Sequence, residues 1–332
     1  PTLRGGFVGG DDHRLVLNHV LVNHPSFAHA VKLFTIVHRD LYQPLPLLTF
    51  SGEFAVANLF GLFDSSIEGG AWLFHLTNVL LHALTTVLVW VTIRMFQQRL
   101  GVPSLAVATV VALLFAVHPF QVEVVAWVNG RMLLLSTLFA LAAVLTFSRW
   151  LEVLKVRYAI LTLAFVLLSS LSKVRVGLPF LLGLVALIQG HKLRTRFWCI
   201  WLPCAALTGW FAWINYQATA GADLFAEGAQ HLWGPWLVRV LLALAFYFQH
   251  LFWPVGLTSY YPTPFVVHWS DASTAVAAII VALSLTILAM LCRISRPCRW
   301  GVLWFFIAIA DTLALIPARN VLAADRYMYL PI

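Results

Sequence analysis

The residues best suited to chemistry lie in one short block, 118–131, with the sequence HPFQVEVVAWVNGR. The block stands between two apolar segments, 104–117 and 132–148, and holds one carboxylate, Glu123, and one guanidinium, Arg131. An ionisable residue at a bilayer edge is costly to keep there, so it marks a candidate functional site. A simpler alternative is that Glu123 and Arg131 pair with each other and cap the two helices. The same block offers three groups for binding a sugar or an acceptor: His118, Trp127 and Asn129.

A second candidate is the acidic pair Asp11 and Asp12, which follows Gly9 and Gly10. Two adjacent carboxylates on a flexible turn can supply a general base or bind a divalent cation. We therefore predict Asp11, Asp12 and Glu123 as catalytic candidates. The alternative for the pair is a solvated turn followed by a helix that Asp12 caps.

Cations and aromatic residues recur at the expected membrane edge. A phosphate could be held there by charge-assisted hydrogen bonds from four residues: Arg131, Lys173, Arg175 and Arg326. The alternative is that these side chains only extend from helix ends toward water. An aromatic turn adds two candidates for contacting an acceptor or a sugar, Tyr260 and Tyr261.

The composition requires a membrane protein, because 61% of the residues are hydrophobic and only 10% are charged. Soluble domains are nearer 45–50% apolar and about 25% charged. Lipid cannot satisfy a free backbone, so an all-α polytopic fold is predicted. We expect eight spans, near 72–93, 104–117, 132–148, 158–172, 177–190, 197–214, 274–292 and 300–317. Segment 236–256 is predicted to be re-entrant or interfacial; if it spans, the number of spans is nine.

The net charge of +8 comes largely from four short basic loops, 94–103, 149–157, 191–196 and 293–299. The positive-inside rule places these loops in the cytoplasm, so the charge is no sign of nucleic-acid binding. The other connections then face outward. The predicted organisation is an outer segment 1–71 with interfacial helices, a transmembrane core 72–317 that includes outer loops 118–131 and 215–273, and an outer segment 318–332. We expect the natural protein to continue beyond both ends.

Six pieces of sequence occur in an order that resembles a known family: LYQPLPLLTF, HLTNVLLHAL, LFAVHPFQVEVVAWVNGRMLLLS, LSKVRVGLPFLL, LFWPVGLTSYYP and ADRYMYLP. They are similar to the membrane part of the transmembrane O-mannosyltransferases with tetratricopeptide repeats and their bacterial relatives, in the GT-C glycosyltransferase class. The resemblance covers nearly the whole chain, and the HPFQVEVVAWVNGR block is its most specific part.

The resemblance implies a GT-C membrane core, a polyprenyl-phosphate sugar donor and an active site on the lumenal or periplasmic face. It matches the acidic pair to Asp11 and Asp12, the HP…E…AW…R block to Glu123 and Arg131, and the lysine of an SKE segment to Lys173. Two departures stand out. Val174 replaces the acid of that segment, and the tetratricopeptide repeats are not in this chain.

These observations predict a glycosyltransferase that moves a mannose-like sugar from a polyprenyl-phosphate donor to a protein or glycan hydroxyl. Asp11 or Asp12 is the expected base, and no cofactor is required beyond a possible divalent cation at that pair. A lipid or solute transporter and a non-catalytic assembly subunit remain the alternatives; a transporter would need polar residues along its spans, and these are few. Because arginine outnumbers lysine, the bacterial inner membrane is favoured over the endoplasmic reticulum.

Overall fold

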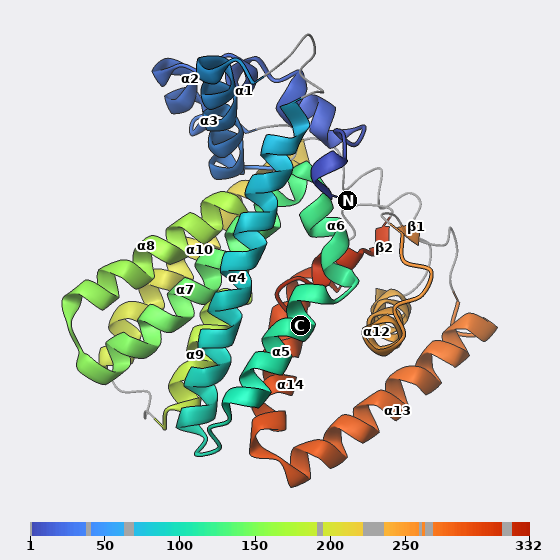
Figure 1. Ribbon diagram of the computed structural model, residues 1–332. Coiled ribbons are helices and arrows are strands. Elements are labelled where there is room, and N and C mark those ends of the chain that lie inside the picture. The colour runs from blue at the N-terminus through green and yellow to red at the C-terminus, as the bar shows by residue number, and fades with distance from the viewer. Residues whose placement is uncertain are drawn as a thin grey trace.

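The computed structural model describes residues 2–37, 41–62, 70–190, 195–221, 236–258, 261–262, 268–313 and 321–332. Helices dominate them (Figure 1). The helices at the expected spans are α4 (Ala71–Arg99), α5 (Leu105–Val117), α7 (Arg131–Val153), α8 (Val156–Ser172), α9 (Leu178–Ile188), α10 (Thr195–Gly221), α13 (Ala272–Ile294) and α14 (Arg296–Ile309). The remaining α-helices are α1 (Val20–Asn23), α2 (Phe27–Leu33), α3 (Pro44–Phe60), α6 (Phe120–Ala126) and α12 (Trp236–Phe252).

The helix lengths support a polytopic membrane protein but not the predicted number of spans. Among the described residues, four helices are long and apolar enough to cross a membrane: α4, α7, α10 and α13. A fifth is possible if α5 and α6, which meet at 60°, form one broken span. Helices α8 and α9 have 17 and 11 residues, whereas a full crossing needs about 20. Eight or nine full spans are therefore not confirmed.

Helix α7 forms the centre of the bundle. Within its apolar window 78% of the residues are buried, against 11% for α4 and for α13. It packs against α4, α8 and α9, and small residues such as Ala140 and Ala143 allow the close approach. A helix that is enclosed on all sides is a rigid support, so the loop that precedes α7 is held firmly in place.

Three of the four predicted basic loops lie at the same end of the bundle in the described part of the chain (Figure 1). The connections after α4, after α7 and after α13 all lie at the end opposite α1–α3 (Figure 1). The connection after α9 falls on residues 191–194, outside the described residues. The opposite end receives the start of α4, the start of α7 and the end of α8. The side of the membrane that each end faces stays a prediction.

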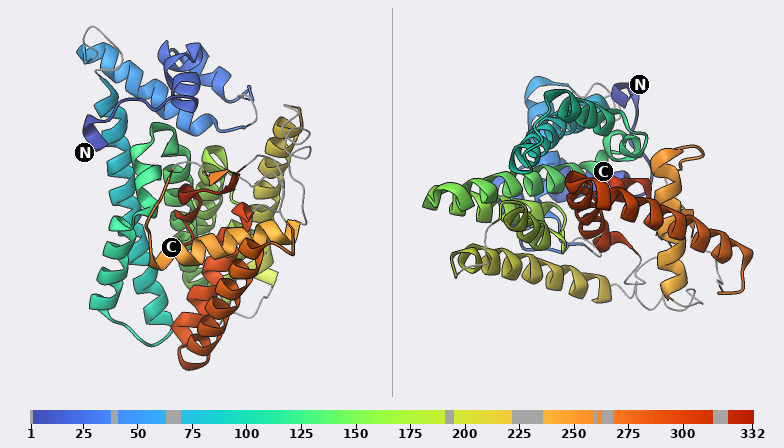
Figure 2. Two further views of the ribbon diagram at one scale, coloured as in Figure 1. Left: turned by 90° about the vertical axis from the view of Figure 1, so that its right-hand side faces the viewer. Right: turned by 90° about the horizontal axis from the view of Figure 1, so that it is seen from below.

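Helix α12 runs across the bundle rather than along it, and in Figure 1 it is seen nearly end-on (Figure 2 gives the other views). It packs against α13 and against strand β2 (Val321–Ala323). That strand pairs antiparallel with β1 (Tyr261–Pro262), with Tyr261 opposite Ala323. The crossing direction agrees with the predicted interfacial or re-entrant segment.

The first segment of the chain forms a small lobe over the start of α4. Its core joins Val16, Val22, Leu47 and Phe50 to Phe74 of α4 and Val128 of the loop before α7. Helix α3 begins at Pro44, and Pro44 and Pro46 occupy its first turn, where a missing N–H costs little. The lobe therefore rests on the block that the sequence marked as the candidate site.

Proline explains the sharp bend between α5 and α6. Pro119 disfavours a helical conformation at the preceding residue, and His118 is extended with φ −63° and ψ 132°. The chain then forms α6, followed by a 3-10 turn, η4 (Val128–Gly130), before α7. These two short elements carry the block across the end of the bundle.

Candidate functional site

Three segments that are distant in sequence meet at the end of the bundle opposite the basic loops. They are α6 with η4, the connection between α8 and α9, and the 3-10 turn η6 (Asp325–Met328). Two glycines allow close packing within and beside these segments, at the turn from α6 to α7 and between the start of α9 and α14. A Cβ on Gly130 would clash with the carbonyl oxygen of Val124, and one on Gly177 would lie 2.5 Å from the carbonyl oxygen of Ile307.

Glu123 holds Arg326 by two contacts. Its Oε1 lies 2.5 Å from Nη1 of Arg326, and its Oε2 accepts a hydrogen bond of 2.8 Å from the Arg326 backbone N–H. The two side chains keep 11% and 15% of their surface exposed. The pair is thus shielded but reachable, and the guanidinium is fixed rather than free to swing.

One further cation, Lys173, and two aromatic rings, Trp127 and Tyr327, lie around this pair. The Arg326 guanidinium lies 5.5 Å from the centre of the Trp127 ring and 5.3 Å from that of Tyr327. The Lys173 ammonium lies 5.4 Å from the same Tyr327 ring. Two positive groups on one aromatic ring attract an anion, and each can donate charge-assisted hydrogen bonds to it. We refer to Glu123, Trp127, Lys173, Arg326 and Tyr327 as the outer cation cluster.

Asp325 adds a second carboxyl beside the cluster. It is buried and hydrogen-bonds the side chain of Tyr261. Burial, with a smaller contribution from the nearby charge of Glu123, raises the pKa of Asp325 to about 6, and the effects of Tyr261 and Arg326 oppose this rise. Burial also raises the pKa of Tyr261 to about 12, so this phenol stays protonated at neutral pH.

The structure gives the two acidic neighbours different environments. Asp12 is fully buried, and its two oxygens accept backbone hydrogen bonds of 3.0 Å from Val8 and from Asn129. It makes no capping bond to the turn that follows, so the predicted helix cap is wrong. Burial raises the pKa of Asp12 to about 6 although both N–H groups favour the carboxylate. Asp11 is half-buried, on a turn where Gly10 has a φ of +83°.

Arg131 points into the protein and does not pair with Glu123. Its side chain has no exposed surface and lies 2.5 Å from Oε2 of Glu53. It also donates to Oδ1 of Asn78 at 2.9 Å and to the carbonyl oxygen of Phe74 at 2.7 Å. The alternative in which Glu123 and Arg131 pair with each other is therefore wrong. Because Arg131 is enclosed, it meets no phosphate in this arrangement.

Arg175 is enclosed as well, and its position separates it from Lys173. Its side chain is buried and donates to the hydroxyl groups of Ser136 at 2.9 Å and Thr137 at 3.1 Å. Of the four cations predicted to hold a phosphate, the structure brings Lys173 and Arg326 together. Arg131 and Arg175 lie inside the packed helices.

The remaining predicted binding residues serve mainly as backbone anchors. His118 accepts from the Phe120 N–H at 3.2 Å through Nδ1, which leaves Nε2 to donate to the carbonyl oxygen of Leu251 at 3.2 Å. The side chain of Asn129 is buried beneath the first segment. Tyr260 lies outside the described residues.

Sequence reasoning did not assign Glu53 or Asn78 to the site, although both hold it together. Glu53 is a lone acid on an apolar helix, a signal that it needs a buried cation. Asn78 donates to the carbonyl oxygens of Trp127 at 2.9 Å and Val128 at 3.3 Å while it accepts from Arg131. His82, on the same helix as Asn78, contacts the Tyr329 hydroxyl at 2.8 Å.

The described residues contain no group of three His, Cys, Asp or Glu side chains that could hold a metal ion. A divalent cation at Asp11 and Asp12 stays a prediction. Such an ion would compete with the two backbone N–H groups that now bind Asp12.

Comparison with known proteins gives partial similarity to mannosyltransferases. A segment of 108 residues is 33% identical to protein O-mannosyl-transferase TMTC3 of Mus musculus, which covers 32% of this chain and 10% of that protein. A segment of 113 residues is 34% identical to protein O-mannosyl-transferase TMTC1 of Homo sapiens, which covers 33% of this chain and 11% of that protein. The similarity therefore spans about a tenth of these relatives.

No family model matches the sequence, and no solved structure was found to match the chain. The similar proteins come from mouse and human. They support a relationship to glycosyltransferases at a multi-pass membrane location, and they give no support to a bacterial inner membrane.

Proposed function

We propose that this chain is a glycosyltransferase that moves a mannose-like sugar from a polyprenyl-phosphate donor to a hydroxyl acceptor on the outward end of its helix bundle. The observation that carries the proposal is the outer cation cluster, where Lys173 and Arg326 share the ring of Tyr327 next to Glu123. The partial similarity to proteins named protein O-mannosyl-transferase supports the reaction type and is the reason for proposing a mannose-like sugar. A membrane-embedded donor suits helices that reach the bilayer.

The charge change in the reaction explains why two cations are needed. The bond between the sugar C1 and the phosphate oxygen breaks, and its electron pair stays on the phosphate. The donor phosphodiester carries one negative charge, and the polyprenyl phosphate that leaves carries up to two. Preorganised cations stabilise charge that develops in the transition state. Arg326, which Glu123 holds in place, and Lys173 are the donors that we assign to this task.

The acceptor needs one base, and the geometry favours Asp11 over Asp12 for that role. Both oxygens of Asp12 are occupied by backbone N–H groups, and the side chain has no exposed surface. Asp11 is half-buried beside it. In the proposed step Asp11 takes the acceptor O–H proton while the acceptor oxygen bonds to C1 from the side opposite the phosphate. The anomeric configuration is thereby inverted, with no covalent sugar–enzyme intermediate.

The bond between Asp12 and the Asn129 N–H joins the base to the cluster. It ties the acidic turn to the loop that carries Trp127 two residues earlier. We assign Asp12 as a positioning residue that sets how Asp11 faces the cations. Asp325 is a second acid at the edge of the cluster, next to Tyr261, and we propose that these two border the acceptor position.

The test is sugar transfer by the purified full chain in lipid nanodiscs, with mannosyl-phosphoryl polyprenol as the donor and a peptide rich in Ser and Thr as the acceptor. Asp11→Asn should lower the transfer rate by about 10²–10⁴-fold, the usual contribution of a general base. Lys173→Gln and Arg326→Gln should also lower the rate. Lys32→Gln, on an exposed position of α2, is the matched control and should transfer at the parental rate.

Each outcome separates the proposal from its competitors. Parental transfer by Asp11→Asn would place the base elsewhere, with Glu123 as the next carboxylate to examine. Movement of the donor lipid between leaflets without any sugar transfer would identify a flippase and end the glycosyltransferase proposal.

A further inference from the structure

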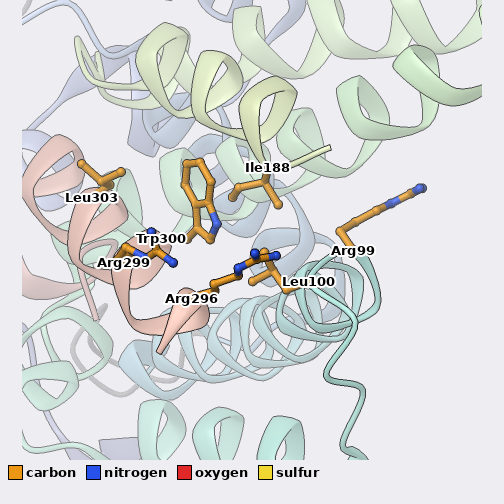
Figure 3. A pocket seen from close by; sticks show the side chains of 7 residues that line it. All are labelled: Arg99, Leu100, Ile188, Arg296, Arg299, Trp300 and Leu303. Carbon is orange, nitrogen blue, oxygen red and sulfur yellow. The ribbon is translucent and has the colours of Figure 1, made fainter. Parts of the chain in front are cut away.

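A charged pocket lies at the opposite end of the bundle from the outer cation cluster. It has a volume of about 460 Å³ and is formed where α4 and α9 end and α14 begins (Figure 3). Its apolar wall consists of Leu100, Ile188, Trp300 and Leu303, and its charged wall of Arg99, Arg296 and Arg299.

Two of the three arginines have no acidic partner in the part of the chain that the structure describes. Among the described residues, no carboxylate lies within ion-pair distance of Arg296 or Arg299. Arg99 differs from them because it forms an ion pair with Glu152, and Figure 3 shows its side chain extending away from the other two. The open charge of the pocket is therefore that of Arg296 and Arg299.

The backbone increases this positive potential. Arg296 and Arg299 lie three residues apart in the first turn of α14, so their side chains share one face of the helix. The N-terminus of a helix carries a partial positive charge and unpaired N–H groups, and the Ser295 side chain accepts from only one of these, Cys298 N–H, at 3.4 Å. Two like charges at this position repel each other and the helix end unless an anion lies between them.

The rest of the pocket is apolar and continues to the outside of the bundle. Leu303 is 46% exposed, and Ile294, two residues before α14, is 84% exposed. Trp300 lines the pocket together with the arginines, and an indole is typical of a membrane interface. A small soluble anion would use the charged wall alone, whereas a lipid would use both walls.

We propose that this pocket binds the phosphate headgroup of an anionic membrane phospholipid, with its acyl chains along Leu303 and Ile294. Guanidinium groups donate paired hydrogen bonds to phosphate oxygens. The pocket opens beside the ends of α4 and α13, two helices long and apolar enough to cross a membrane. The site does not depend on the proposed sugar transfer, which uses residues at the other end of the chain's bundle.

The experiment titrates the delipidated full chain in neutral detergent with short-chain phosphatidylglycerol and follows the thermal unfolding midpoint. Arg296→Gln combined with Arg299→Gln should weaken the apparent affinity by about tenfold or more, the equivalent of one or two lost charge-assisted contacts. The matched control is Lys155→Gln combined with Arg293→Gln. It removes the same charge from exposed positions at the same end, outside the pocket, and should bind as the parent does.

Two further ligands identify what the pocket selects. Short-chain phosphatidylcholine should bind more weakly than phosphatidylglycerol, because its headgroup carries no net charge. Free glycerol phosphate should bind more weakly than the lipid, because it cannot use the apolar wall. The proposal is overturned if the double Gln variant binds phosphatidylglycerol like the parent. It is overturned equally if glycerol phosphate binds as tightly as the lipid, since the ligand would then be a soluble anion.

Discussion

Replacing Arg131 with Met separates an architectural role from a phosphate-binding one. The Arg131 guanidinium has no exposed surface and contacts Glu53, Asn78 and the carbonyl oxygen of Phe74. Methionine keeps much of the apolar volume but removes the charge and every hydrogen bond. Removing one member of a buried ion pair costs about 3–5 kcal/mol, because the other charge stays buried without a partner. A domain with about 5–15 kcal/mol of stability loses a large share of it.

A double variant tests whether the ion pair itself is the cause. Combining Arg131→Met with Glu53→Leu removes both charges and fills the site with apolar groups. Such replacements are often close to neutral. Here Oδ1 of Asn78 and the carbonyl oxygen of Phe74 both lose the N–H group that donates to them, and each unsatisfied acceptor costs about 1–3 kcal/mol. We expect the double variant to be more stable than Arg131→Met alone, yet less stable than the parent.

The assay is unfolding of the purified variants in one detergent, together with the affinity for the polyprenyl-phosphate donor measured on folded protein. The control is Arg157→Met, an exposed arginine that contacts only Tyr158 in the described structure and should change stability by less than about 0.5 kcal/mol. If Arg131→Met unfolds at the parental midpoint while donor affinity falls, Arg131 binds the phosphate directly. Its assignment to the protein interior would then be wrong.

Two further predictions follow from the same region. Gly130→Ala should cost about 1–3 kcal/mol, because its Cβ meets the Val124 carbonyl oxygen; the matched control Gly209→Ala has open space around it, and equal unfolding midpoints for the two variants would contradict the close packing. The pKa of Asp12 is about 6 in the folded protein, against an ordinary 3.8. Between these two values the folded state holds a proton that the unfolded state has released. The free energy of unfolding should therefore fall by up to about 3 kcal/mol as pH rises from about 4 to about 6. Asp12→Asn should reduce this pH dependence of the unfolding free energy and leave the part due to Asp325. An unchanged pH dependence would show that the pKa of Asp12 is not raised in the folded protein.

The helices could be predicted because their signals are local. Apolar runs and prolines are read within a few residues, and each of the eight expected segments contains a helix. The ends of these helices were harder to predict from the sequence. Helix α4 extends to Arg99, beyond its predicted end, because the polar residues of its last turns remain compatible with a helix. Helix α9 has only 11 residues, so it is too short to span alone.

The ion pairs could not be predicted, because their partners are far apart in the sequence and meet only in the folded protein. Glu53 and Arg131 lie 78 residues apart, and Glu123 and Arg326 lie 203 residues apart. Proximity in sequence favoured a pair between Glu123 and Arg131, eight residues apart. Arg131 pairs with Glu53 instead, because the first lobe packs on α4 and brings Glu53 to Arg131. The placement of Asp12 depends on the same packing, since its partner Asn129 belongs to another element.

The turn η4 explains how one block of sequence can serve two purposes. Before it, α6 places Glu123 toward η6, where the carboxylate holds Arg326. The chain is extended at Trp127, with φ −86° and ψ 124°, and then turns tightly to begin α7. This reversal sends Arg131 inward to Glu53. Glu123 therefore fixes the partly exposed cation Arg326, while Arg131 fixes the loop to the protein interior.

The division between the two ends of this block follows from desolvation. An arginine without exposed surface must satisfy its donors inside the protein, and Arg131 does so with a carboxylate, an amide and a carbonyl group. Such a group is poorly suited to exchange partners with a substrate, because every exchange leaves Glu53 buried and alone. Arg326 keeps 15% of its side chain exposed and uses one guanidinium nitrogen for Glu123. It can meet a phosphate without giving up that contact, and for this reason we assign the binding step to Arg326 and the architecture to Arg131.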